Sequence, residues 1–247
     1  MNNSIRNILS RVLSAVPKNL FINFIVNLTK MRIYPLSPEE SLRVLFNIEN
    51  ALYKKTVQEA VRYGNGESPK HRLIGFHDFF KSYIQPKQKV IDIGCGIGSV
   101  SYDIAATIGA RILAIDINET SINIARTKFT YPNIEYRVGD ALKDLPDQIF
   151  DAVILSNVLE HLPDRPIFLK RVYSNLHPSI ILVRVPLFER DWRVPLKKEL
   201  GVEWRLDSTH ETEYTVESFK EEIEMAGLHI SHHEVHWGEI WAVLKAL

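Results

Sequence analysis

Hydrophobic residues recur at helical spacing in the first quarter of the chain. Within residues 1–16 the apolar side chains fall on one side of a helical wheel, and Pro17 ends the pattern. A mainly apolar run over residues 20–28 is too short to cross a membrane. Another helical pattern covers residues 37–61, ahead of a segment rich in glycine, asparagine and proline. We therefore expect an N-terminal helical extension over residues 1–66.

The rest of the chain, residues 67–247, alternates short apolar runs with amphipathic stretches. Strands are expected at residues 90–93, 111–116, 134–138, 150–156, 180–185, 228–235 and 239–245, and helices at 70–80, 99–108, 119–128, 166–176 and 216–226. Strands that are apolar on both faces and alternate with helices predict an α/β fold with a parallel sheet covered on two sides. Residues 187–214 are too many for an ordinary connection, and their mixed charges and aromatic residues predict a lid or substrate wall.

Four histidines lie in or next to the strand expected at residues 228–235. Simple alternation places His229 and His233 on one face, and His232 and His236 on the other. This distribution favours solvated histidines on an edge strand over a metal cluster.

A glycine-rich loop follows the first expected strand. It runs from Asp92 to Gly98 as Asp-x-Gly-x-Gly-x-Gly, and a helix is expected to begin near Ser99. Glycines let a ligand approach the bare backbone, and the amide N–H groups at the helix start point toward that ligand. Asp116, at the tip of the next strand, is placed to accept hydrogen bonds from a ribose diol. The pattern therefore predicts a nucleoside-binding site.

Two nucleotide-binding patterns compete at this loop. The dinucleotide fingerprint Gly-x-Gly-x-x-Gly needs a third glycine where this chain has Ser99, which disfavours a dehydrogenase. The observed spacing, led by Asp92, instead resembles motif I of the class I S-adenosylmethionine-dependent methyltransferases. Three further segments resemble that family in order: Asp116 its ribose-binding acid, Gly139-Asp140-Ala141 the loop beside its adenine, and residues 150–162 its fourth strand and the following turn.

This resemblance implies a fold and a cofactor. The fold is a Rossmann-like sheet of seven strands in the order 3-2-1-4-5-7-6, with strand 7 antiparallel and helices on both faces. The cofactor is S-adenosylmethionine, and the residues implied to bind it are Arg72, Asp92, Gly94, Cys95, Gly96, Gly98, Asp116, Ile117, Gly139, Asp140, Ala141 and Asn157. For Arg72 two interpretations stay open, a pair with the carboxylate of the cofactor and a solvated helix residue.

The acceptor side is expected to involve two histidines and an acid. His161 comes directly after the fourth expected strand, and Asp207 and His210 lie in the lid segment. Because imidazole titrates near neutral pH, His210 held by Asp207 is a candidate general base. In the alternative, His210 only ties the loop together by hydrogen bonds.

A metal site is a further possibility. Some methyltransferases of quinone precursors and of small-RNA ends hold a divalent metal with a Glu-x-x-Glu-His motif, and the RNA enzymes add a later histidine. This chain has Asn157 in place of the first glutamate, followed by Glu160 and His161. A partial site of Glu160, His161 and His210 therefore competes with an interpretation in which Glu160 caps a helix and no metal is bound.

The amino-acid composition limits the kinds of substrate and binding partner that we expect. Thirty Lys plus Arg and thirty Asp plus Glu give a formal net charge of zero, which argues against a nucleic-acid substrate. The single cysteine, Cys95, cannot form a disulfide within the chain, which suits a cytoplasmic protein. Residues 1–38 contain basic but no acidic side chains, so residues 1–30 are candidates for peripheral contact with the inner membrane surface. Capping of the core, a homodimer and an organellar presequence are the alternatives.

We predict a methyltransferase that transfers a methyl group in line to an oxygen of a sugar, glycan or lipid-linked acceptor. The polar and aromatic lid segment suits a polyol, and the basic amphipathic start suits a membrane surface. Methylation of a quinone, polyketide or amine metabolite is the first alternative. A non-catalytic scaffold that binds the cofactor is the second.

Overall fold

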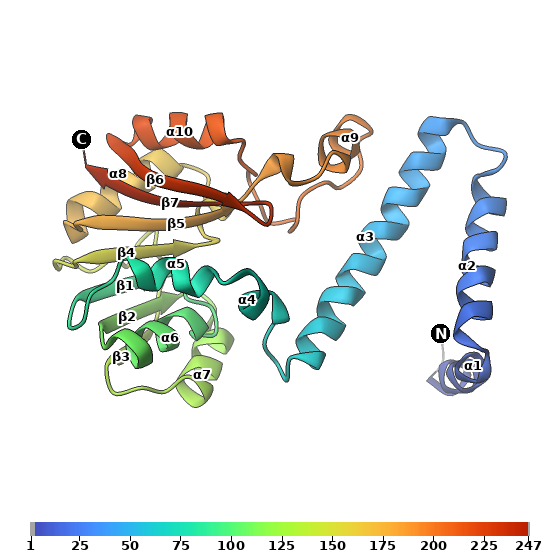
Figure 1. The fold of residues 1–247 in the computed structure, drawn as a ribbon, viewed down its shortest axis with the longest axis horizontal. Coiled ribbons are helices and arrows are strands. Elements are labelled where there is room, and N and C mark those ends of the chain that lie inside the picture. Colours follow the sequence, from blue (N-terminus) through green and yellow to red (C-terminus); the bar gives the residue numbers. More distant parts are fainter. Residues whose placement is uncertain (1–2, 247) are drawn as a thin grey trace. The chain divides into compact units, whose positions relative to one another are not determined.

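The computed structural model describes residues 3–246, except for the side chains of Asn3, Ser4 and Arg6 (Figure 1). The chain forms two compact units. The smaller contains residues up to 58 together with 197–203, and the larger contains residues 59–196 and 204–247. The boundary between the two units lies at residues 58–59. The sequence predicts that the N-terminal extension ends slightly later, at residue 66.

The larger unit is built on one seven-stranded sheet in the order β3-β2-β1-β4-β5-β7-β6. The strands are β1 (Lys89–Ile93), β2 (Arg111–Asp116), β3 (Ile134–Val138), β4 (Ala152–Ser156), β5 (Ile180–Pro186), β6 (Leu228–His236) and β7 (Glu239–Ala246). The first five pair in parallel, and β7 is antiparallel to both β5 and β6. The predicted strand order and the direction of strand 7 are therefore confirmed.

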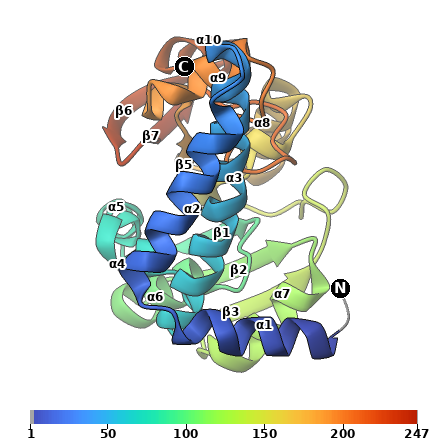
Figure 2. The same cartoon turned by 90° about the vertical axis from the view of Figure 1, so that its right-hand side faces the viewer.

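Helices cover both faces of this sheet (Figures 1 and 2). They are α5 (Phe76–Ser82), α6 (Ser99–Ile108), α7 (Glu119–Lys128), α8 (Arg165–Leu176) and α10 (Val216–Met225), and the short α4 (Pro69–Ile74) precedes α5. Alternate residues of β1 show the two layers. Val90 packs in a core with residues of α5, α6 and α7, whereas Ile91 packs in a core with residues of α8 and α10. The inner strands of the sheet are buried on both sides, as their continuous apolar pattern predicts, whereas the edge strands β3 and β6 are largely exposed.

Two details of the helices differ from the sequence-based expectation. The single helix expected over residues 70–80 is broken at Gly75, which has a left-handed φ of 69° and ends α4. This break turns Phe76 and Phe80 of α5 into the core. The predicted lid segment, residues 187–214, for which no helix was expected, contains the 3-10 helix η2 (Phe188–Arg190) and the helix α9 (Arg193–Glu199).

That segment is closed at its base by backbone hydrogen bonds. Phe188 N–H donates to Tyr214 O at 2.6 Å, and Tyr214 N–H donates to Pro186 O at 3.3 Å. Leu187 and Tyr214 form an isolated parallel bridge. The segment therefore leaves the sheet and returns to it at nearly the same point.

The edge strand β6 contains a bulge. His229 pairs with Lys245 and His232 with Val243, so that Ser231 is an extra residue in the ladder. The bulge shifts the alternation and places His229 on the same face as His232 and His236. The expectation that His229 shares a face with His233 is therefore wrong, because it assumed an uninterrupted strand.

The smaller unit contains α1 (Asn3–Ala15), α2 (Lys18–Ile33) and most of α3 (Pro38–Tyr63). Within this unit, Arg43 of α3 donates to Leu200 O at 2.9 Å, and Lys197 pairs with Glu49 at 2.9 Å. No residue of α2 is buried. Among the described residues, no single helix is long and apolar enough to span a bilayer. By length and composition alone, residues 7–15 and 18–33 together pass that test as a pair bent by 112°.

Candidate active site

The glycine-rich loop is held between two neighbouring strands. Gly94 and Cys95 both donate their N–H groups to Ile115 O of β2, at 2.7 and 3.1 Å. Gly94 has a φ of +74°, and a Cβ atom at this position would lie 2.5 Å from Val158 Cγ2. The sequence needs glycine here because both the backbone conformation and the contact with the segment after β4 exclude a side chain.

The middle of the loop is open. A Cβ atom on Gly96 would meet no atom within 4 Å, although its φ is +55°. The helix α6 follows with Gly98 as its N-cap, and no side chain caps it. The first amides of a helix have no acceptor within the helix, so they are available to a ligand that lies on the loop.

Asp92 supports the loop from below. Its side chain is 1% exposed and accepts a hydrogen bond from Ser101 Oγ of α6 at 2.5 Å. Burial raises the pKa of Asp92 to about 7, although the bond from Ser101 acts in the opposite direction. This contact links β1 to the first turn of α6.

Asp116 lies at the tip of β2, where the ribose-binding acid is expected. Its Oδ2 accepts from Gly96 N–H at 2.7 Å, and its Oδ1 accepts from Asn118 N–H at 2.8 Å. Each carboxylate oxygen keeps a second lone pair for a ribose hydroxyl. The next side chain, Ile117, is 71% exposed and offers an apolar surface beside this acid.

The loop after β3 reaches the same edge of the sheet. Gly139 N–H donates to Asp116 O at 3.0 Å. Asp140 accepts from Leu142 N–H at 2.8 Å and pairs with Lys143, and these interactions lower the pKa of Asp140. Ala141 O accepts from Arg171. The loop is thereby fixed beside β2.

Two other predicted cofactor residues lie at different places. Arg72 is exposed on α4, so both interpretations of its role stay predictions. Asn157 follows β4 in a left-handed conformation, with a φ of 57°. Its N–H donates to Arg184 O, but its buried Oδ1 atom has no hydrogen-bond partner in the structure.

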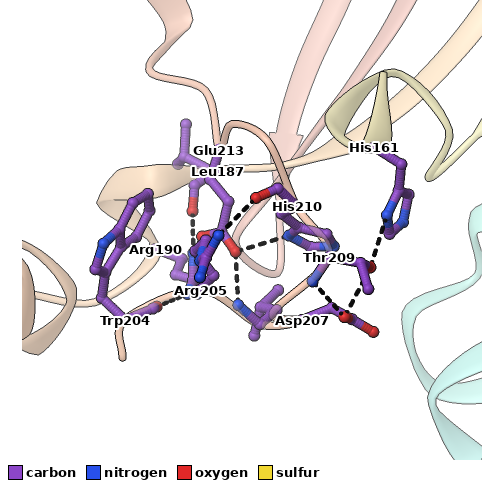
Figure 3. Close-up of polar contacts among 10 residues, drawn as sticks. His161, Leu187, Arg190, Trp204, Arg205, Asp207, Thr209, His210 and Glu213 are labelled. Carbon is purple, nitrogen blue, oxygen red and sulfur yellow. Dashed lines mark hydrogen bonds and ion pairs between the residues drawn. The ribbon is translucent and has the colours of Figure 1, made fainter. Parts of the chain in front are cut away.

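Two histidines meet on the acceptor side (Figure 3). His161 ends the 3-10 helix η1 (Leu159–His161), and His210 lies on the loop that precedes α10. Glu211 N–H donates to Glu160 O at 2.7 Å and so attaches this loop to η1. The rings of His161 and His210 pack edge to face, with centroids 4.7 Å apart.

The partner of His210 differs from the predicted one. His210 Nδ1 lies 2.9 Å from Glu213 Oε1, and both side chains are buried. Glu213 also accepts from Leu206 N–H at 2.6 Å and pairs with Arg190. Asp207 was expected to hold His210, but its Oδ1 accepts from Thr209 N–H, two residues on, at 2.9 Å. This local turn directs the Asp207 carboxylate to Thr209.

His161 is held by the same turn. Its Nδ1 lies 3.0 Å from Thr209 Oγ1, and Thr209 Oγ1 donates to Asp207 Oδ1 at 2.8 Å (Figure 3). Burial and the neighbouring His210 lower the pKa of His161. The chain therefore anchors two imidazoles through two carboxylates, Glu213 and Asp207. The sequence alone does not identify Glu213 and Thr209. Their closeness to His210 in the chain is the only feature of the sequence that points to them.

Glu160 completes the cluster. Its side chain is fully buried, and neither carboxylate oxygen has a hydrogen-bond partner in the structure. Burial raises the pKa of Glu160 to about 7. One potential ligand atom each of Glu160, His161 and His210 lies within 4.8 Å of the others. The structure thus brings together the three residues that the sequence names as a partial metal site.

The loop, Asp116 and the segment 139–141 fit S-adenosylmethionine. Space above Gly96, amides at the start of α6 and a carboxylate at the tip of β2 match an amino-acid tail and a ribose diol. The contact between Gly94 and Val158 brings the segment after β4, which carries Glu160 and His161, next to this loop.

Comparison with known proteins agrees with this description. Residues 91–183 match the family model described as a methyltransferase domain. The chain is 30% identical over 156 residues to the 2-methyl-6-phytyl-1,4-hydroquinone methyltransferase of Synechocystis sp., a match that covers 59% of this chain and 48% of that protein. It is 30% identical over 129 residues to the ubiquinone biosynthesis O-methyltransferase of Bradyrhizobium diazoefficiens, covering 50% of each. The chain thus spans about half the length of these curated relatives.

The solved structures show the same fold. A crystal structure of a SAM-dependent methyltransferase from Aquifex aeolicus superposes with a TM-score of 0.57 at 18% identity, covering 80% of this chain and 98% of that one. The matched family region ends at residue 183, before the lid segment that carries His210. Residues 91–183 therefore match a methyltransferase domain, the larger unit has the fold of a solved SAM-dependent methyltransferase, and the glycine-rich loop with Asp116 fits S-adenosylmethionine as the cofactor.

Proposed function

We propose that the protein methylates a hydroxyl group of a sugar, glycan or lipid-linked acceptor. One observation carries this proposal: two imidazoles anchored by carboxylates lie on the segments that follow β4 and β5, next to the glycine-rich loop. Ligands of parallel sheets bind beyond the carboxyl ends of the strands, where these segments begin. An anchored imidazole suits a hydroxyl acceptor because a hydroxyl loses its proton when it is methylated.

The cofactor, His210 and Glu213 have different roles in the proposed methyl transfer. The bound cofactor supplies a methyl group on a sulfonium, and alignment of acceptor, methyl and sulfur can provide about 7–11 kcal/mol of the barrier reduction. Nδ1–H of His210 donates to Glu213, which leaves the Nε2 lone pair free to accept the proton of the hydroxyl. Glu213 then stabilises the imidazolium. Such a base contributes about 10²–10⁴-fold to the rate.

The lid segment supports a polyol as the acceptor. Trp192 is 72% exposed, so its ring is available for stacking, and the neighbouring Asp191 and Arg193 form an ion pair at 2.5 Å. Polar groups beside an aromatic surface suit a ring that carries many hydroxyls. The zero net charge argues against a polyanionic acceptor.

A quinol is the second candidate. The two relatives described above are named for a hydroquinone substrate and for ubiquinone biosynthesis. A phenolic hydroxyl also has to lose a proton, so the same His210–Glu213 pair serves this reaction. The two acceptor classes require different lid surfaces. A quinol needs an apolar wall, whereas a polyol needs hydrogen-bonding groups.

The test is transfer of a radiolabelled methyl group from S-adenosylmethionine to two panels, one of nucleotide sugars and lipid-linked glycans and one of quinols. We expect label in the first panel and a 10²–10⁴-fold loss in kcat for His210→Gln. His236→Gln on the exposed edge strand is the matched control and should keep full activity. Label only in the quinol panel would select the second candidate. Tight cofactor binding with no transfer to either panel would favour a non-catalytic scaffold.

A further inference from the structure

We propose that Glu160, His161 and His210 form a binding site for one divalent transition-metal ion. The inference deepens the proposed function, because such an ion would lie where the acceptor hydroxyl is expected. The binding itself does not depend on which acceptor is used. The metal site is inferred from the burial and the hydrogen bonds of each of the three side chains.

Glu160 is the first element. The side chain is fully buried, and neither of its carboxylate oxygens has a hydrogen-bond donor. A buried carboxylate without a donor is strongly destabilising unless a proton or a cation compensates it. The Asn157 side chain lies beside this carboxylate, and its Oδ1 atom is also buried and without a partner. A bound cation would compensate the buried charge of Glu160 where a proton does not.

His210 is the second element. Glu213 already accepts from Leu206 N–H and pairs with Arg190, which identifies its carboxylate as ionised. The bond between Glu213 Oε1 and His210 Nδ1 therefore has Nδ1 as the donor. In the neutral imidazole this leaves Nε2 with a lone pair. A histidine whose second nitrogen donates to a carboxylate is the usual arrangement of a metal-binding imidazole.

His161 is the third element, and its hydrogen bond to Thr209 fixes which ring nitrogen carries the proton. The hydroxyl of Thr209 has a single proton, and Thr209 donates it to Asp207 Oδ1 at 2.8 Å. Thr209 Oγ1 therefore accepts from His161 Nδ1–H at 3.0 Å, and His161 also keeps its lone pair on Nε2. Both histidines thus keep an Nε2 lone pair that can bind a metal ion.

Three acceptor groups converge without a donor among them. One potential ligand atom of each residue lies within 4.8 Å of the other two, and the two rings are in contact. Two imidazole nitrogens and one carboxylate oxygen form a set that favours Zn²⁺, Mn²⁺ or Fe²⁺ over Mg²⁺ and Ca²⁺, which prefer oxygen ligands. Three protein ligands also leave a coordination position for another oxygen.

A bound metal ion would change the role of His210 in the reaction. With the ion bound, His210 Nε2 is a ligand and no longer accepts a proton. The acceptor hydroxyl would take the open coordination position, where the metal lowers its pKa and its proton is released to water. Glu213, Thr209 and Asp207 would then act as positioning residues that hold the two imidazoles.

The experiment measures metal binding directly. The full chain, free of any tag and saturated with S-adenosylhomocysteine, is treated with a chelator and titrated calorimetrically with Zn²⁺, Mn²⁺ and Mg²⁺. We expect one equivalent of Zn²⁺ or Mn²⁺ and at least 100-fold weaker binding of Mg²⁺. Glu160→Gln and His210→Ala should each weaken binding by at least 100-fold. The matched control is His236→Ala, because His232, Glu234 and His236 carry the same ligand types on the exposed edge strand.

The outcomes separate the two proposals. Unchanged affinity for S-adenosylhomocysteine shows that each variant is folded. No stoichiometric metal binding by the wild type, or binding that survives in Glu160→Gln and His210→Ala, overturns the metal site. If turnover persists without metal and is lost in His210→Gln, the methyltransferase proposal stands with His210 as the base.

Discussion

Glu213 and Arg190 form a buried ion pair, and the same carboxylate holds Nδ1 of His210 at 2.9 Å. The side chain of Glu213 is fully buried, and that of Arg190 is 12% exposed. One acid therefore both stabilises the lid segment and orients the imidazole of the candidate site.

Removal of Glu213 should affect stability and catalysis together. Glu213→Ala leaves Arg190 buried without its partner, so we expect a loss of about 3–5 kcal/mol in the free energy of unfolding, measured with urea. Asp207→Ala, the matched control, should cost less than about 1 kcal/mol because Asp207 is exposed. Equal losses in the two variants would contradict a stabilising role for the buried pair of Glu213 and Arg190.

Gly94 should be intolerant of any side chain. Gly94→Ala places a Cβ atom 2.5 Å from Val158 Cγ2, so we expect at least a tenfold loss in S-adenosylhomocysteine affinity by calorimetry. Gly109→Ala is the matched control, since Gly109 has a similar φ of +78° but no atom within 4 Å of the added Cβ. It should cost about 1–2 kcal/mol of stability and leave affinity unchanged. If Val158→Ala does not recover affinity in the Gly94→Ala background, the steric explanation is wrong.

Asp116 should contribute to cofactor affinity through the ribose. Asp116→Ala removes two backbone hydrogen bonds and the expected ribose contacts, so we expect a loss on the order of 2–3 kcal/mol in binding free energy. Calorimetric titration with S-adenosylhomocysteine measures it. Undiminished affinity would mean that the ribose does not lie at the tip of β2.

Acid should weaken the fold through Glu239. Burial acts to raise the pKa of this carboxyl, but the hydrogen bonds and charges of Arg184 and Lys70 hold it lower, at about 2 instead of 4.5. Because the pKa is depressed in the folded state, the stabilisation is present above about pH 4.5 and is lost as the pH falls toward 2. Its size is on the order of 3 kcal/mol.

Glu239→Gln tests this pH dependence. The variant should be less stable than the wild type at pH 7, and the difference in unfolding free energy should shrink between pH 4.5 and pH 2.5, measured with urea. A difference that stays constant over this range would exclude Glu239 as the titrating group.

The sheet was predictable because its signal is local. The inner strands β1, β2, β4, β5 and β7 are short, mainly apolar runs, and the strand order follows from the family resemblance. The bulge at Ser231 and the break at Gly75 were missed because a single extra residue or a single left-handed glycine leaves the hydrophobic pattern almost unchanged. Tertiary packing, which a local pattern does not contain, decides such details.

The sequence predicts which residues lie on the acceptor side, but it does not predict which of them form hydrogen bonds with one another. His161, His210 and Glu160 stand out in the sequence, and the structure brings them within reach of one another. Proximity in the chain predicts Asp207 as the partner of His210. The turn instead directs Asp207 to Thr209, while Glu213, three residues after His210, reaches the ring. Side-chain direction in an irregular segment cannot be read from spacing alone.

The bridge between Leu187 and Tyr214 brings the two ends of the lid segment together. Its two ends meet at one point of the sheet, whereas the recognisable family region ends at residue 183. A change anywhere between these ends can therefore alter the choice of acceptor while the cofactor half of the protein stays intact. If the proposed acceptor site is right, residues 187–214 are therefore the segment in which acceptor preference can diverge between proteins that hold the methyl donor in the same way.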